Sequence, residues 1–125
     1  MLADPGLRPH GLFETARSLH GLGRLQKAID HYQLLLKETP GHADAAANLA
    51  VLLEKTGQLD NALAWAERTL VLAPRNTTAA LTRAQVLRRL GRFEEAATQL
   101  EALLEQNLPP INRVIAANQL AQCLD

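Results

Sequence analysis

Apolar residues recur at steps of three and four along most of the chain, which is the period of an amphipathic helix. Polar residues fill the places between them, and the apolar stretches are separated by glycines and prolines, which end helices. The pattern therefore predicts seven helices joined by short turns. Their expected ranges are 10–22, 26–38, 43–56, 60–72, 77–90, 93–106 and 111–124.

The same arrangement returns at a step of thirty-four residues. Gly23, Gly57 and Gly91 are each followed two places on by a large apolar residue and five places on by an alanine. A fixed period in this range is typical of an array of stacked units. An alanine also stands seven residues before each glycine, and a residue expected to face inward stands nine after it. These residues are Ala16, Ala50 and Ala84 before the glycines, and Tyr32, Ala66 and Leu100 after them.

Each copy of the repeat predicts a helical hairpin. Glycine suits the left-handed residue that ends a helix, because it has no Cβ to clash. Pro40 and Pro74 are expected to stop the second helices, since proline lacks a backbone donor. Small residues allow the two helices of a hairpin to approach closely, and the expected contacts are Ala16 with Ala28, Ala50 with Ala62 and Ala84 with Ala96. Asp60, Thr77 and Thr78 are candidate N-caps.

This pattern resembles the tetratricopeptide repeat, a helix-turn-helix unit of the same period. The resemblance covers residue 9 to about residue 107, and it departs from the family at the usual tryptophan place, which holds Leu12, Ala46 and Ala80. It implies an all-α fold, a right-handed superhelical α-solenoid of three hairpins and a C-terminal helix.

The repeat divides the chain into a lead-in, 1–8, three hairpins, 9–42, 43–76 and 77–110, and a terminal segment, 111–125. The lead-in is either a plain N-terminus or the tail of an earlier repeat. The terminal segment is either a capping helix or the first helix of a fourth repeat. If the loop around Pro109 and Pro110 holds about three extra residues, Ala121 takes the small position and Leu124 the leucine position.

Composition argues against several function classes. Lys and Arg number 13, as do Asp and Glu, so no net charge attracts nucleic acid or an anionic membrane. No apolar run reaches membrane-spanning length, and the single cysteine cannot form an internal disulfide. Cys123 is interpreted as a small apolar core residue. We expect a cytoplasmic protein that binds neither nucleic acid nor membrane.

No motif predicts catalysis, a cofactor or a bound metal. The four histidines are scattered, the glycines follow the repeat instead of forming a phosphate loop, and the one serine has no nucleophile context.

The family resemblance instead implies a concave groove lined by the first helix of each repeat, which would hold a protein or peptide partner. Arginines there could meet acidic groups, Asn48 could bond an extended backbone, and Phe13, Val51 and Leu81 could form an apolar strip. The candidate groove residues are Phe13, Arg17, His20, Asn48, Val51, Lys55, Leu81, Gln85, Arg88 and Arg89.

One subtype of the family is a poor match. Repeats that clamp the C-terminal carboxylate of heat-shock chaperones use lysine and asparagine in the first repeat, asparagine in the second, and lysine and arginine in the third. Only Asn48 agrees with that pattern, since the five places hold Phe13, Arg17, Asn48, Thr78 and Thr82.

Two further hypotheses stay open. Residues 120–125 are similar to the repeat region that precedes the catalytic domain of bacterial sulfotransferases, so the chain could be the non-catalytic part of a larger bacterial enzyme. Alternatively, an unfinished last repeat exposes an apolar helix face, which favours a homodimer.

Overall fold

The structure is a row of helical hairpins. The computed structural model describes residues 8–124, so the predicted lead-in lies outside the described residues except for residue 8. No strand occurs within this range. The seven predicted helices are confirmed, each with bounds within two residues of those expected. They are α1 (Arg8–Gly21), α2 (Leu25–Glu38), α3 (Ala43–Lys55), α4 (Leu59–Leu72), α5 (Thr77–Arg89), α6 (Phe93–Leu104) and α7 (Pro110–Leu124).

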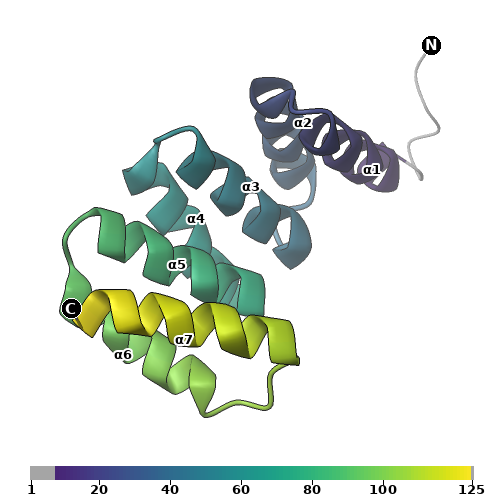
Figure 1. The fold of residues 1–125 in the computed structure, drawn as a ribbon. Coiled ribbons are helices and arrows are strands. Elements are labelled where there is room, and N and C mark those ends of the chain that lie inside the picture. Colours follow the sequence, from purple (N-terminus) through teal and green to yellow (C-terminus); the bar gives the residue numbers. More distant parts are fainter. Residues whose placement is uncertain (1–7, 125) are drawn as a thin grey trace.

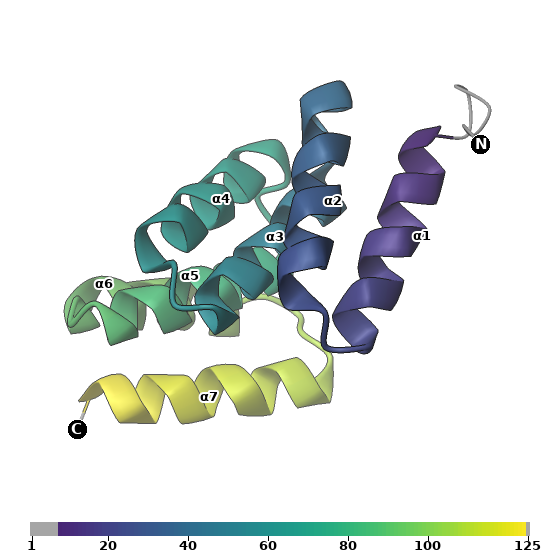
Figure 2. The ribbon, with the colours of Figure 1, turned by 90° about the horizontal axis from the view of Figure 1, so that it is seen from above.

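The helices form two layers. Each helix packs on the next one in the chain, and in addition α3 contacts α5 and α5 contacts α7. Figure 1 shows the hairpins following one another from α1 to α7, and Figure 2, seen from above, shows α1 and α2 of the first hairpin side by side. Contacts between near neighbours, repeated along an axis, define an α-solenoid. The predicted fold class is therefore confirmed.

The glycine turns inside the three hairpins are the same. Gly23, Gly57 and Gly91 have φ values of 79°, 82° and 80°, in the left-handed region that favours glycine. The residue after each glycine donates its backbone N–H to the carbonyl five residues earlier, at 2.9, 2.8 and 2.8 Å. This is the Schellman arrangement, which satisfies the last carbonyls of a helix.

Prolines end the second helices as predicted, but the predicted caps were wrong. Helices α2 and α4 stop two residues before Pro40 and Pro74. The side chains that cap α3 and α5 are His42 and Asn76, which accept from the N–H groups of Ala45 and Ala79 at 3.1 and 2.9 Å. They stand thirty-four residues apart, each just before its helix. The three residues expected as caps, Asp60, Thr77 and Thr78, lie instead inside the first turns of α4 and α5.

Alanine contacts hold the two helices of each hairpin together. The six alanines expected at these contacts are buried, with at most 1% of their surface exposed. Tyr32, Ala66 and Leu100 are also buried, as expected for inward-facing positions. Because alanine adds little width, the helix axes can approach closely and the backbone itself becomes part of the packed interface.

The core extends along the array in two clusters. The first extends from Ala16 on α1 to Val86 on α5, with Trp65 packed against it, and the second joins Ala80 and Ala84 on α5 to Leu100, Leu103 and Ala116. Helices are therefore laid side by side and do not surround one centre.

Helix α7 packs on the two helices before it, α5 and α6, as α5 packs on α3 and α4. Ala116 is buried, and Leu120 and Cys123 pack partly buried against the second cluster. These residues lie thirty-seven places after Ala79, Arg83 and Val86, which agrees with three extra residues in the loop. In this register Ala121 does take the small position, which Ala84 occupies on α5. Ala121 is exposed, however, because no described helix packs beside α7 in the way that α6 packs beside α5.

Leucine at Ala62 should disrupt the contact between α3 and α4. Ala62 is fully buried, so Ala62→Leu adds volume where none is available and should lower the free energy of unfolding by about 1–3 kcal/mol. Ala64→Leu, at an exposed site on the same helix, is the matched control and should change it little. Urea denaturation followed by circular dichroism measures both. Equal stability of the two variants would contradict the packing described for Ala62.

The contribution of the His42 cap to stability can be tested by substitution, with the Asn76 cap of α5 as a guide to the replacement residue. His42→Ala removes the acceptor for Ala45 N–H and should cost about 1 kcal/mol of stability. His42→Asn should keep most of it, because Asn76 already performs this role one repeat later. If the two variants unfold at the same urea concentration, the stabilisation does not come from the side-chain cap.

Candidate functional site

Phe13 lies in an aromatic cluster at the start of the array. Its ring centroid is 6.1 Å from that of Tyr32, in an edge-on contact, and 4.9 Å from that of His42. The Arg17 guanidinium lies 5.7 Å from the Phe13 ring centroid, in a cation–π contact. Phe13 is half-buried and already packed against these side chains.

A pocket of about 320 Å³ opens beside this cluster, between the first two hairpins. Asn48 on α3 donates its side-chain N–H to the phenol oxygen of Tyr32 on α2, at 3.2 Å. Tyr32 has 0% of its surface exposed, so its phenol oxygen positions the Asn48 side chain from within the fold. The pocket is lined by Arg17, His20, Gly21, Tyr32 and Asn48.

Basic groups surround the pocket. Arg17 pairs with Glu14 at 3.2 Å, but more than half of each side chain is exposed, so the pair is weak. The Lys55 ammonium lies 3.4 Å from Nε2 of His20. Burial lowers the pKa of His20 below 6.5, and the charge of Lys55 lowers it further. The imidazole is therefore held neutral beside a lysine, and Nε2 can accept a hydrogen bond from it.

The predicted groove residues of α5 form the other end of this face. The side-chain oxygen of Gln85 accepts from Nη2 of Arg88 at 2.7 Å. Arg89 donates to the backbone carbonyl of Glu54 at 2.8 Å and pairs with its carboxylate, so it joins α5 to α3. Nε of Arg88 is buried and has no hydrogen-bond partner among the described residues.

The structure thus divides the predicted residues into two groups. Arg17, His20 and Asn48 line one pocket, with Lys55 at its edge, whereas Gln85 and Arg88 lie further along the array. Val51 and Leu81 are partly buried, so the expected apolar strip is only partly accessible. Thr82, one of the positions that a chaperone-tail clamp would need, is buried against the core.

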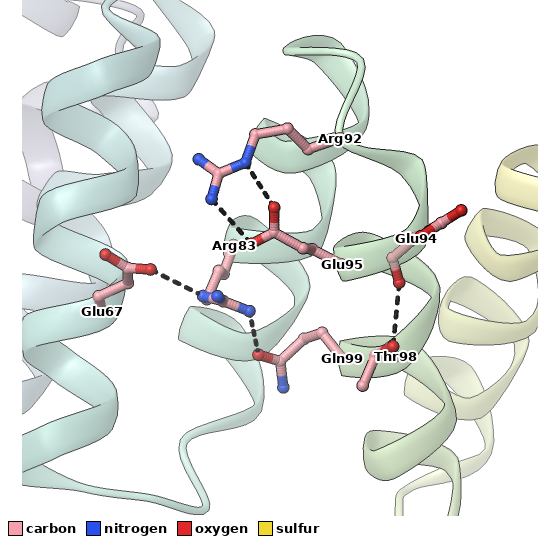
Figure 3. Close-up of polar contacts among 7 residues, drawn as sticks. All are labelled: Glu67, Arg83, Arg92, Glu94, Glu95, Thr98 and Gln99. Atoms are coloured by element: carbon pink, nitrogen blue, oxygen red, sulfur yellow. Dashed lines mark hydrogen bonds and ion pairs between the residues drawn. The ribbon is translucent and has the colours of Figure 1, made fainter.

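A second hollow lies on α5 and α6, outside the predicted groove. It has a volume of about 470 Å³, and Arg83 is among the residues that line it. The guanidinium donates to the Glu67 carboxylate on α4 at 3.1 Å and to the Gln99 side-chain oxygen on α6 at 3.0 Å, as Figure 3 shows. Nearby, Arg92 binds both carboxylate oxygens of Glu95 and lowers the pKa of that carboxyl.

Sequence reasoning missed this polar cluster, although the repeat contains a signal for it. Thirty-four residues before Arg83 stands Leu49, which is fully buried, and thirty-four before Gln99 stands Trp65, which packs against the core. A charged residue at the place of a buried leucine, and an amide at the place of a tryptophan, indicate that polar groups take part in the contact between the second and third hairpins.

Within residues 8–124, no group of three or more His, Cys, Asp or Glu side chains is placed to hold a metal ion. In the same part of the chain, no helix combines the length and apolar character needed to cross a membrane.

The sequence matches two family models. One, described as Tetratricopeptide repeat, matches residues 13–77, and another, described as Anaphase-promoting complex, cyclosome, subunit 3, matches residues 55–124. No curated protein matches the chain in sequence.

Solved structures of low sequence identity share the fold. The first TPR domain of Spaghetti (RPAP3), bound to the HSP90 peptide SRMEEVD, has a TM-score of 0.86 at 22% identity, with 94% of this chain and 90% of that chain covered. The second TPR domain of human RPAP3, in complex with an HSP70 peptide, has a TM-score of 0.84 at 18% identity, with 98% and 99% covered. The TPR domain of Arabidopsis OM64 has a TM-score of 0.82 at 19% identity, with 92% and 93% covered.

The effect of the Lys55 charge on the pKa of His20 can be measured by titrating His20. Lys55→Met should raise the pKa of His20 but leave it below 6.5, because burial is the larger cause of the shift. The control Lys37→Met removes the same charge from α2 and should leave the pKa of His20 unchanged. NMR titration of the ring protons measures it.

The lowered pKa of His20 also makes the stability of the fold depend on pH. The unfolded chain binds the His20 proton more readily than the folded chain, so this residue destabilises the fold as the pH falls through 6.5 and below. A pKa of His20 that does not move in Lys55→Met would exclude the proposed lysine contact.

Proposed function

Since the chain belongs to the tetratricopeptide repeat family, we propose that it is a protein-interaction module that holds an extended segment of a partner protein along its odd-numbered helices. It carries out no chemistry of its own. The observation that supports this most directly is the pocket between the first two hairpins, where Arg17 and Asn48 provide hydrogen-bond donors to one small volume and buried Tyr32 positions Asn48.

The charges along this face favour an acidic segment. Arg17, Lys55 and Arg88 lie on successive odd-numbered helices. The carboxylates near them are already engaged, because Glu14 pairs with Arg17 and Glu54 with Arg89. An incoming carboxylate could replace Glu14 on Arg17 at low cost, since that pair is exposed and weak. Arginine binds carboxylates with two parallel hydrogen bonds, which gives such a contact direction as well as strength.

The segment we propose differs from a chaperone tail. RPAP3 domains of the same fold are bound to HSP90 and HSP70 peptides. This chain has Phe13, Thr78 and Thr82 where a two-sided clamp would need basic side chains, and the first and last of these are packed into the protein. Without these basic side chains a terminal carboxylate would have no two-sided clamp, so the chain should recognise an internal acidic side chain instead.

The remaining hypotheses stay predictions. These are attachment to a sulfotransferase-like catalytic domain, bacterial origin and a cytoplasmic location. The proposed peptide contact does not depend on them, because all of its residues lie within the first three hairpins.

A displayed library of random peptides tests the proposal without knowledge of the natural partner. Panning against the folded protein should enrich acidic sequences, and binding of a synthesised hit should weaken by roughly tenfold or more in Arg17→Glu, because a repulsive charge replaces an attractive one. Arg75→Glu makes the same charge change at an exposed site outside the groove and is the matched control. Isothermal titration calorimetry measures the affinities.

The outcome can contradict the proposal in two ways. If no peptides are enriched above a blank support, the groove does not bind extended peptides. If the hits bind Arg17→Glu and wild type equally well, the pocket is not the contact site. The peptide SRMEEVD serves as a specificity control, and we expect it to bind no better than a scrambled version.

A further inference from the structure

Helix α7 has an apolar side that no described residue covers. Val114 and Leu124 are 55% and 70% exposed, and the exposed residues Ala117 and Ala121 lie between them. Steps of three and four residues place these four side chains on one stripe along the helix. The buried side of α7, around Ala116, faces a different direction and packs against the second core cluster.

The same stripe is an interface elsewhere in this fold. Thirty-seven residues earlier, Ala80, Ala84 and Leu87 occupy the places of Ala117, Ala121 and Leu124. All three are buried, and Ala80 and Ala84 share the second core cluster with Leu100 and Leu103 of α6. The stripe on α7 therefore has the residues that a neighbouring helix covers in the preceding hairpin.

Few charges oppose contact with a second helix. The only charged residue between positions 110 and 124 is Arg113. Its guanidinium is held by the backbone carbonyls of Leu104 at 3.2 Å and Gln106 at 3.0 Å, at the end of α6. Depletion of charge is a property of the cores of protein interfaces, so two copies of this helix would meet without like-charge repulsion.

The order of residues along the stripe specifies the partner. The sequence is large, small, small, large, and it is symmetric about position 119, since 114 and 124 lie equally far from it, as do 117 and 121. Two antiparallel copies would set Val114 against Leu124 of the second copy and Ala117 against its Ala121. A two-fold interface requires this kind of self-complementary pattern.

We propose that α7 pairs with α7 of a second copy, antiparallel and about a two-fold axis near residue 119, to form a homodimer. Small residues at the centre let the two helices approach closely, and the large residues cover both ends of the contact. A single helix pair lies at the low end of the sizes of stable interfaces, so the dimer should dissociate in the micromolar range.

The dimer would leave the proposed peptide groove open. Arg17, His20 and Asn48 belong to the first two hairpins, whereas the stripe lies on the last helix of the array. Two grooves would then be held in one particle, so a partner with two acidic segments could bind both and gain avidity. Failure of the dimer would not affect peptide binding by the monomer, and the two proposals can be tested separately.

Analytical ultracentrifugation of the full chain over a series of micromolar concentrations tests the proposal. Wild type should shift from monomer to dimer as the concentration rises. Ala121→Glu places a carboxylate at the centre of the contact and should weaken dimerisation by about tenfold or more, because the charge would be buried without a partner. Gln122→Glu adds the same charge next to it, off the stripe, and should dimerise like wild type. Both sites are exposed, and circular dichroism confirms folding.

Disulfide trapping tests the register. In a Cys123→Ala background, a mixture of Ala117→Cys chains and Ala121→Cys chains should form a mixed disulfide, whereas each chain alone should cross-link far less. A parallel arrangement would instead cross-link each variant with itself. A monomer at every concentration, equal dimerisation by Ala121→Glu, or cross-linking of like chains only would overturn the proposal; the first result would mean that the stripe receives another segment or partner.

Discussion

The stability of each hairpin depends on the close contact between its two helices and on the next hairpin in the row. The helices contain 12 to 15 residues, and isolated helices of about this length are only marginally stable in water. Alanines at the crossing points bring the backbones together, and the glycine turns repeat the same geometry three times. Each hairpin packs against the next one through the same kind of interface. Because these interfaces repeat along the row, helices this short can form a stable array.

This way of packing limits which side chains the odd-numbered helices can offer to a partner. Phe13 contacts Tyr32 and His42, and Arg89 joins α5 to α3, so neither is simply an exposed groove residue. Residues one turn away, such as Arg17, keep most of their side chain in solvent. The candidate site therefore consists of side chains that the packing does not use. Its donors lie between α1 and α3, two helices that are connected mainly through their shared neighbour α2.

The positions of the helices and turns could be predicted from the sequence because their causes are local. Glycine is needed where φ is positive, and proline cannot continue a helix, so both mark boundaries wherever they stand. The caps were harder to predict, since Asp60 and Thr77 are good cap residues in general but lie one or two places inside their helices. The role of His42 depends on the extended backbone at that residue, which composition does not reveal.

Within the candidate site, the repeat register predicted which residues lie on the first helix of each hairpin, but not which of them bind one another. The Arg83 cluster is the clearest example, because its partners Glu67 and Gln99 are each sixteen residues away in the chain and lie on two different helices. The identity of such partners is decided by how the hairpins stack, which no local pattern records. Only the comparison with Leu49, one repeat earlier, shows from sequence that this position is unusual.

The two junctions between hairpins therefore differ in the polar contacts that they contain. At the first, Leu49 and Trp65 bury apolar surface, which has no preferred direction and is little affected by salt. At the second, Arg83 makes hydrogen bonds of fixed geometry to two helices at once, and its ion pair with half-exposed Glu67 weakens as salt screens it. The second junction also buries apolar surface, since Val86 on α5 belongs to the first core cluster and Leu70 on α4 packs against the second. The Arg83 hydrogen bonds therefore add directional contacts to an apolar junction, whereas the first junction has only apolar packing at the place of Leu49.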